Sequence, residues 1–144
     1  MFSKACEYGI RAVLYIAEQS QHDNRVNIKE ISRTIDSPEA FTAKILQQLA
    51  RNGIVNSLKG PAGGFVIEPD KLETLMLSDI VFAIDGDHIY TGCGLGLPQC
   101  SDEMPCPVPH KFVSVREGLR EMLENTSIIE LTKDLNKGLS FLKR

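Results

Sequence analysis

A glycine- and proline-rich segment separates two short β-rich runs near the middle of the chain, at residues 54–58 and 65–67. The segment reads Lys59-Gly60-Pro61-Ala62-Gly63-Gly64, and glycine and proline at this density favour a turn between two strands. A glycine loop that binds nucleotide phosphates would lead into a helix, whereas a strand is expected here. The pattern therefore predicts a β-hairpin with a tip at which glycines allow the backbone to approach another molecule closely.

Apolar residues at helical spacing predict three helices before this hairpin, over residues 3–19, 28–34 and 38–51. Asn27 can cap the second helix, and Glu30 at its third position supports the same start. Pro38 suits the first position of the third helix, because its missing N–H is harmless there. The order helix, helix, turn, helix and hairpin predicts a winged helix-turn-helix domain over residues 1–68.

Three further segments are expected after this domain. Residues 69–85 contain a connecting helix, residues 86–110 form a loop rich in glycine, proline and cysteine, and residues 111–144 form a dimerisation helix followed by a C-terminal helix. Ser78 can cap the connecting helix, over residues 79–84. Ser127 and Glu130 have the spacing of a capping box, which predicts a last helix over residues 128–136. The expected fold class is mainly α with a small β-hairpin: a winged helix-turn-helix domain plus a long dimerisation helix.

An apolar stripe follows the helix expected over residues 111–125. The stripe has no obvious partner within its own chain, and monomers seldom tolerate an exposed apolar patch of this kind. Packing of the stripe against its symmetry mate would bury it. The sequence therefore predicts a homodimer with an interface that contains Phe112, Val115, Leu119, Met122 and Leu123.

The predicted domain indicates double-stranded DNA as a partner. In a helix-turn-helix the second helix of the pair enters the major groove, and the wing touches phosphates or the minor groove. Thr42, Lys44 and Gln47 are expected at non-core positions and are types that can reach base edges, while Arg51 and Lys59 suit phosphates. An ordinary solvated helix face is the alternative, and the adjoining wing favours DNA. The residues predicted to contact DNA are Ser3, Lys4, Thr42, Lys44, Gln47, Arg51, Ser57, Lys59, Gly60, Pro61 and Gly63.

The distribution of charge gives this interpretation modest support. The net charge is −3, but residues 1–67 hold eight Lys/Arg against six Asp/Glu, while residues 68–144 hold eight against thirteen. The basic excess therefore lies in the part expected to bind DNA. The N-terminus does not resemble a signal peptide, and no run approaches the roughly 18 apolar residues of a membrane span. We expect a cytoplasmic protein that does not bind membranes.

Three cysteines in the loop, Cys93, Cys100 and Cys106, have the spacing C-x6-C-x5-C. In the reducing cytosol such residues are more often metal ligands or redox thiols than disulfides, and thiolates favour zinc or iron–sulfur clusters. The spacing is wider than the C-x2-C pair of zinc knuckles, which counts against a simple structural zinc site. The alternative is a set of free or disulfide-forming thiols. Cys6 lies beside core positions of the first helix and is expected to be buried and inert.

A site with three thiolates needs a fourth ligand, and several residues could supply it. His110 lies four residues beyond the last cysteine of the loop. Glu7 is distant in sequence, but it lies on the first helix, which the loop of a dimer partner could reach. Asp102 and Glu103 are also near the cysteines. The residues alone do not decide among these four.

The chain resembles the Rrf2 family of bacterial winged-helix transcriptional regulators, in particular its IscR-like and NsrR-like iron–sulfur members. The resemblance rests on Ser3-Lys4, on Leu-Ala-Arg-Asn-Gly-Ile-Val at residues 49–55, on the wing at residues 59–65 and on the three cysteines. It implies a homodimer on a partly palindromic operator, with long helices near residues 107–125 packed across the dimer axis. It also implies a two-iron or four-iron cluster on the cysteines that controls DNA binding in response to redox, iron or nitric oxide status.

The sequence departs from the family pattern at two positions. IscR-like members have a histidine three residues after the last cysteine, where this chain has Pro109, and His110 follows one residue later. Other members use an acidic residue of the first helix as a ligand, and Glu7 falls at about that place. Ala43 stands where IscR-like members have an acidic residue that tunes the choice of DNA, so the operator does not carry over.

Two other functions are compatible with the pattern of residues. One is a metal-free regulator of the same fold that senses thiol oxidation or a ligand. The other is a small redox enzyme or cluster carrier, which the sequence disfavours because it has no C-x-x-C pair and no credible general base near a cysteine. We therefore expect a regulator and not an enzyme.

Overall fold

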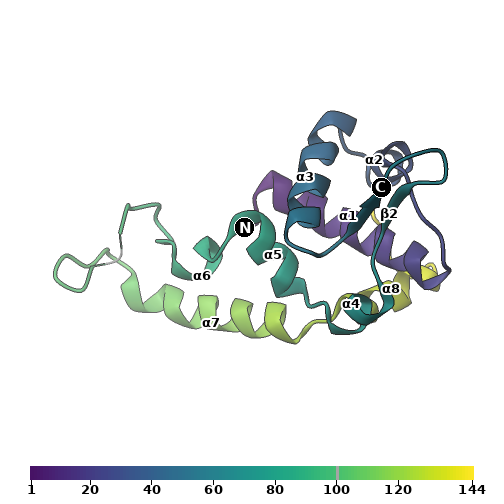
Figure 1. Ribbon diagram of the computed structural model, residues 1–144. Helices are drawn as coiled ribbons and strands as arrows, with labels where there is room; N and C mark the ends of the chain where they lie inside the picture. Colours follow the sequence, from purple (N-terminus) through teal and green to yellow (C-terminus); the bar gives the residue numbers. More distant parts are fainter. Residues whose placement is uncertain (100) are drawn as a thin grey trace.

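The computed structural model describes residues 1–99 and 101–144, with the side chains of all of these except Pro109 and His110. Its elements in chain order are α1 (Lys4–Gln21), α2 (Ile28–Ile35), α3 (Glu39–Arg51), β1 (Asn56–Leu58), β2 (Gly64–Val66), α4 (Pro69–Thr74), α5 (Leu77–Asp85), α6 (His88–Thr91), α7 (Pro109–Asn125) and α8 (Ile128–Asn136). The expected fold class is confirmed, because the described residues are mainly helical with one two-stranded antiparallel sheet (Figure 1).

Local capping decides where the first helices begin and end. The Ser3 hydroxyl accepts a hydrogen bond from Cys6 N and starts α1. Asn27 and Glu30 form the expected capping box at α2, with both hydrogen bonds at 2.9 Å. Asp36 ends α2 in the left-handed conformation, with φ 53°. Pro38 is the N-cap of α3 instead of its first residue, so α3 begins one residue later than expected.

The hairpin has the geometry that its glycines demand. Its register pairs Ser57 with Phe65 and Leu58 with Gly64. Gly64 has φ +136°, which L side chains rarely adopt, and a Cβ added at Gly63 would lie 2.1 Å from the Leu58 carbonyl oxygen. Val26 and Phe65 exchange backbone N–H···O bonds of 3.2 and 2.7 Å. This bridge fixes the wing to the connection between α1 and α2.

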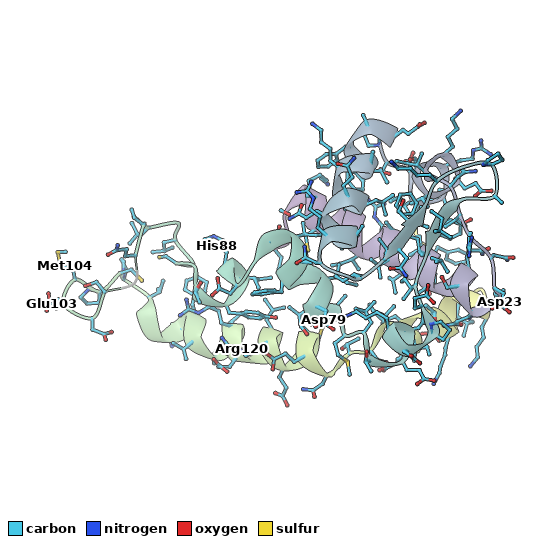
Figure 2. All side chains as sticks on the ribbon, in the orientation of Figure 1. Asp23, Asp79, His88, Glu103, Met104 and Arg120 are labelled. Atoms are coloured by element: carbon cyan, nitrogen blue, oxygen red, sulfur yellow. The ribbon has the colours of Figure 1, made fainter. Side chains whose placement is uncertain are left out.

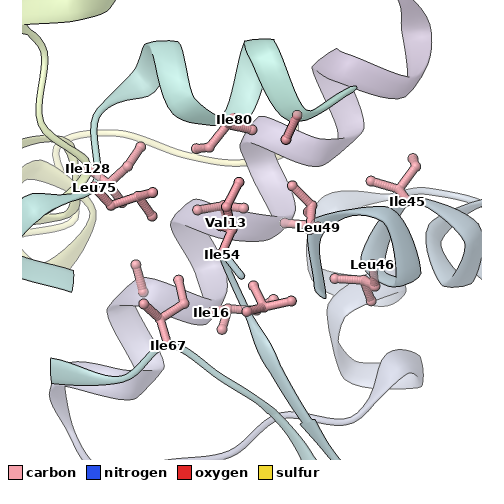
Figure 3. Packing of buried hydrophobic residues seen from close by; sticks show 14 of the residues in the cluster. Val13, Ile16, Ile45, Leu46, Leu49, Ile54, Ile67, Leu75, Ile80 and Ile128 are labelled. Atoms are coloured by element: carbon pink, nitrogen blue, oxygen red, sulfur yellow. The ribbon is translucent and has the colours of Figure 1, made fainter. Parts of the chain in front are cut away.

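The hydrophobic core is arranged around α1. Figure 3 shows Val13 and Ile16 of α1 among side chains from several other elements, including Leu49 of α3, Ile80 of α5 and Ile128 of α8. Helices α2, α3, α5 and α8 all contact α1. The predicted winged domain and the C-terminal helix therefore share one core.

The structure corrects the expected course of residues 69–110. Helices α4 and α6 were not expected from the sequence. The connecting helix is longer than the range 79–84, and its N-cap is Met76 instead of Ser78. The Asp79 carboxylate accepts a hydrogen bond of 2.8 Å from Met76 N at this cap. Helix α7 begins two residues before the expected Lys111.

The C-terminal part of the chain packs against its beginning. Gln21 Nε2 donates to Thr132 Oγ1 of α8 at 2.7 Å. The Arg11 guanidinium donates to the carbonyl oxygens of Ile35 at 2.8 Å and Leu142 at 3.3 Å. The C-terminus accordingly lies beside α2 (Figure 1).

Helices α6 and α7 extend away from the rest of the molecule, and the loop between them lies at the far end (Figure 1). Figure 2 shows Glu103 and Met104 at the tip of this loop. Among the described residues, no helix is both long and apolar enough to cross a membrane.

Candidate DNA interface and cysteine loop

The outer face of α3 carries most of the residues predicted to read DNA. Lys44, Gln47 and Arg51 are exposed on this face, as expected. Beside this face, the rings of Phe41 on α3 and Tyr8 on α1 meet edge to face, with centroids 5.7 Å apart. Helix α3 is therefore packed on α1 by one face and presents its polar face to solvent.

Thr42 does not lie on that polar face, and its expected non-core position is wrong. Its side chain is 0% exposed, and its hydroxyl donates to the Pro38 carbonyl oxygen at 2.8 Å. A second hydrogen bond joins this hydroxyl to that of Ser37. Thr42 thus closes the turn between α2 and α3 from inside. A fully buried hydroxyl that already has two partners cannot reach a base edge from this position.

The wing presents polar and backbone groups at its tip. Ser57, Lys59, Gly60 and Pro61 are exposed, and Gly63 is half-buried. Gly63 N donates to Gly60 O at 2.9 Å, which closes the tip, and Gly60 has φ +100°. The tip is therefore a defined turn that displays one cation and several unhindered backbone groups.

The predicted contacts at the N-terminus are engaged within the protein. Ser3 N donates to Asp85 Oδ2 at 3.1 Å, and Ser3 Oγ donates to Asp85 Oδ1. Lys4 Nζ lies 2.8 Å from Glu7 Oε2 on the exposed surface of α1. Their hydrogen bond and mutual attraction raise the pKa of Lys4 and lower the pKa of Glu7. Ser3 belongs to the contact between α1 and α5, and Glu7 is held by a cation of its own helix.

Cys93 lies at the start of the loop with a partly exposed thiol. Leu95 N donates to Cys93 Sγ at 3.4 Å. The backbone N–H groups of Leu95 and Leu97, with a further contribution from the thiol of Cys106, hold the pKa of Cys93 below its usual value. Cys93 and Cys106 are both free cysteines, and their thiols lie close enough for Cys106 to contribute to the lowered pKa of Cys93. The loop therefore brings two of the predicted ligands together and favours the thiolate at the first.

Of the remaining predicted ligands, only the acidic residues Glu7, Asp102 and Glu103 have described side chains, and they do not complete a metal site with these two cysteines. Cys100 and the side chain of His110 lie outside the described residues. Within the described part of the chain, no group of three or more His, Cys, Asp or Glu side chains could hold a metal ion. Glu103 and Asp102 are exposed in the loop. Glu7 belongs to α1, a helix that lies away from the loop tip in a single protomer (Figure 1).

The start of the loop is anchored on α7. The Arg116 guanidinium donates to Gly92 O at 2.9 Å. A Cβ added at Gly94 would lie 2.7 Å from the ring of Phe112, so the loop backbone passes directly over this aromatic side chain. Cys93, Phe112 and Arg116 also line a cavity of about 340 Å³ that reaches Met1. The position of Cys93 is thus fixed by side chains of α7.

Cys6 is buried, as expected. Burial, and then the nearby Asp85 carboxylate, raise the pKa of its thiol to about 12. A thiol in this state is a poor nucleophile and a poor metal ligand.

The predicted dimer stripe divides into two parts. Val115 and Met122 are 62% and 45% exposed. Phe112 and Leu119 are half-buried against their own chain. Leu123 is 0% exposed. The prediction that this residue has no partner within its own chain is therefore wrong. The physical reason is that α5 packs against α7 and Leu123 joins the core cluster of its own chain.

Comparison with known proteins places the chain among regulators. A profile of the family described as "Rrf2: Iron-dependent Transcriptional regulator" matches residues 2–134. An HTH-type transcriptional regulator of Aquifex aeolicus is 32% identical over 143 residues, which cover 96% of each chain. The regulator IscR of Photorhabdus laumondii is 25% identical over 127 residues, or 88% of this chain and 76% of that protein.

Solved structures show the same fold. The chain is similar to CymR, the global cysteine regulator of B. subtilis, with a TM-score of 0.72 and 20% identity over 92% of this chain and 96% of that one. It is also similar to IscR of T. potens, with a TM-score of 0.71 and 19% identity over 97% and 91% of the two chains. Because the family profile covers nearly the whole chain and a relative above 30% identity matches end to end, this protein belongs to the Rrf2 family of transcriptional regulators and is not an enzyme.

Proposed function

We propose that this regulator binds its operator as a homodimer and that an iron–sulfur cluster held by Cys93, Cys100 and Cys106 controls that binding. The observation that carries the proposal is the environment of Cys93. Backbone N–H groups directed at its sulfur favour the anionic thiolate, which is the form that ligates iron, and such hydrogen bonds also tune the potential of a cluster.

The two described cysteines of the proposed donor set suit a cluster. Cys106 lies within reach of Cys93, and both thiols are free and partly exposed. A glycine-rich backbone between Cys93 and Leu97 can wrap around a compact centre. Bound there, a cluster would supply a centre that responds to oxidants, iron or nitric oxide. Arg116 and Phe112 hold the beginning of the loop on α7.

The proposed DNA interface consists of the exposed face of α3 and the wing. Lys44 and Gln47 would reach base edges, while Arg51 and Lys59 would contact phosphates. Ser57 and the glycines and proline of the tip would allow the backbone to approach the duplex. Thr42 is left out of this interface because it is buried.

The proposed dimer interface follows the exposed part of the α7 stripe. Val115 and Met122 are apolar and largely exposed, and Leu119 lies between them. Pairing of two such helices about a twofold axis would bury the same residues on both protomers. Two recognition helices would then reach successive half-sites of a partly palindromic operator.

The experiment that tests the cluster is anaerobic purification, followed by visible absorbance and assays of iron and acid-labile sulfide. We expect absorbance in the visible range, with iron and sulfide in equal amounts. Replacing any one of Cys93, Cys100 and Cys106 by Ala should abolish it, whereas the matched variant Cys6→Ala should keep it, since that thiol is buried. Zinc without iron in the parent protein would exclude a cluster.

The fourth ligand can be found with the same assay. Three thiolates already hold the cluster, so loss of the fourth ligand should shift the spectrum and shorten the lifetime of the cluster in air instead of preventing assembly. We expect either His110→Ala or Glu7→Ala to have this effect and the other to behave like the parent protein. If neither changes the spectrum, the fourth site holds water, a small thiol or another acidic residue such as Asp102.

The proximity of Cys93 and Cys106 also favours a second candidate, a regulator that senses oxidants with thiols alone. A disulfide between the two would release two protons and two electrons to an oxidant such as a peroxide. Mass spectrometry of cluster-free protein before and after peroxide treatment would detect the loss of two hydrogens. This candidate requires that oxidation change operator affinity in protein that never contained iron.

A further inference from the structure

The last turn of α5 joins the DNA-binding helices to the cysteine loop. Gln48 of the recognition helix α3 donates from Nε2 to the carbonyl oxygens of Ala83 at 2.9 Å and Ile84 at 3.4 Å. The final carbonyls of a helix have no partner within that helix. The side-chain amide of Gln48 therefore caps α5, although it belongs to a helix that is distant in sequence.

Asp85, the last residue of α5, makes the second connection. Its carboxylate accepts hydrogen bonds from both the backbone N–H and the hydroxyl of Ser3, the N-cap of α1. The negative charge of Asp85 also lies beside the N-terminus of α1, which is the positive end of the dipole of that helix. The beginning of α1 and the end of α5 are thus held together by a pair of hydrogen bonds to one charged group.

Close packing makes the same junction rigid. Gly9 of α1 faces Ile84 of α5 and Ile45 of α3, and a Cβ added at Gly9 would lie 2.1 Å from Ile84 Cδ1 and 3.3 Å from Ile45 Cγ2. Three helices therefore meet with no free space between them. A close-packed contact of this kind transmits a displacement because it cannot absorb one.

The cysteine loop begins at the same turn. Gly86 ends α5 with φ +68°, the short helix α6 follows, and Cys93 comes directly after Gly92. Both α6 and Gly92 are held against α7, so the segment between Asp85 and Cys93 is short and anchored at both ends. A change in the path of the loop therefore acts on the last turn of α5.

We infer that Gln48 and Asp85 are positioning residues that couple the state of the cysteine loop to the pose of the recognition helix. Neither residue is placed on the DNA surface or among the cluster ligands. Gln48 would transmit the position of α5 to α3, and Asp85 would transmit it to α1. This inference rests on the proposed function, because it concerns the regulation of the same site.

The test compares operator affinity in the cluster-loaded and cluster-free forms of each variant. The operator is first selected from randomised DNA with the parent protein, and its Kd is then measured anaerobically by fluorescence anisotropy. Gln48→Met removes the donor but keeps the length of the side chain. Asn52→Leu is its matched control, because Asn52 is the C-cap of α3 and its amide donates to Gln48 O of that helix at 2.8 Å.

Allosteric coupling is commonly worth about 5–150-fold in affinity, and we expect Gln48→Met to reduce the ratio between the two forms to less than about threefold. Asn52→Leu should keep the parent ratio. Asp85→Asn tests the second connection, with Asp79→Asn as its control, because the Asp79 carboxylate only caps the other end of α5. Circular dichroism establishes whether each variant is folded. If Gln48→Met does not fold, the inference is tested with Asp85→Asn alone.

The failure of the inference is distinct from the failure of the proposed function. If the parent protein binds DNA with the same affinity in both forms, cluster control is absent, and the inference falls with it. If the parent ratio is large and both Gln48→Met and Asp85→Asn keep it, the inference alone is overturned. Equal weakening of both forms would also overturn it, because that result assigns the two residues a structural role only.

Discussion

Leu123 offers a sharp test of how α7 is used, since the sequence pattern assigns it to the dimer stripe and the structure buries it within one protomer. Its side chain is 0% exposed. Truncation of a leucine in a core costs about 2–5 kcal/mol, depending on how far the surroundings collapse into the space. Here collapse is restrained, because Leu77 N donates to Thr126 O and Ile128 N to Leu75 O, each at 2.9 Å.

We therefore expect Leu123→Ala to lower the free energy of unfolding by about 3–5 kcal/mol, in the upper part of the usual range. The measurement is urea unfolding followed by circular dichroism, at one fixed protomer concentration because dimerisation contributes to apparent stability. Sedimentation velocity under native conditions should show the same dimer as the parent protein.

Val115→Asp is the matched variant on the exposed side of the same helix, where the side chain is 62% exposed. A charge there should give folded monomers, because the proposed interface would bury it without a partner. The reasoning is refuted if Leu123→Ala becomes monomeric while it keeps the stability of the parent, since that result would place Leu123 in the interface.

Three further predictions concern the DNA interface and the thiols. Lys59→Ala should weaken binding to all DNA sequences alike and make the slope of log Kd against the logarithm of salt concentration shallower by about one unit. An unchanged slope would mean that Lys59 does not contact a phosphate. Gln47→Ala should alter the preferred base at one position of the selected operator, with about 1–3 kcal/mol of binding free energy at stake. Thr42→Val should lower the stability of the protein and leave the selected consensus unchanged. If Thr42→Val also changed the consensus, Thr42 would have to be exposed in the complex with DNA. In cluster-free protein, the lowered pKa of Cys93 keeps its thiolate populated to lower pH than in a free cysteine, while the raised pKa of Cys6, about 12, keeps that thiol protonated at neutral pH. Peptide mapping after iodoacetamide treatment should therefore find Cys93 modified before Cys6, and equal modification of Cys6 in the folded protein would contradict this order.

The sequence was most informative where structure is decided by neighbouring residues. The capping box of Asn27 and Glu30 depends on a spacing of three residues, and the hairpin depends on glycines that are adjacent in the chain. Helix α4 also had a local signal that could have been used, because Pro69 occupies its first turn and Leu72 its buried face. Helix α6 has only one turn and offers no periodicity.

The residues that were placed incorrectly depend on how helices and turns pack against one another. Thr42 has the polarity of a surface residue, and only the approach of α2 to α3 buries its hydroxyl. Leu123 fits an amphipathic stripe, and only the packing of α5 against α7 shows that its partner lies in its own chain. The contact of Gln48 with Ala83 spans 35 residues, so no local pattern could predict it.

The packing of α8 against α1 has a consequence for the order in which the protein can fold during synthesis. Helix α1 is made before α8, but one side of it is covered by Ile128 and the residues around Thr132, which are synthesised only after the cysteine loop and α7. Domains generally fold as units while the chain emerges, beginning at the N-terminus. Here a nascent chain that ends after the wing would leave apolar surface of α1 exposed to water. The DNA-reading surface thus reaches its final form only after the cysteine loop and α7 have been synthesised, so a truncated translation product should not compete with the intact protein for the operator.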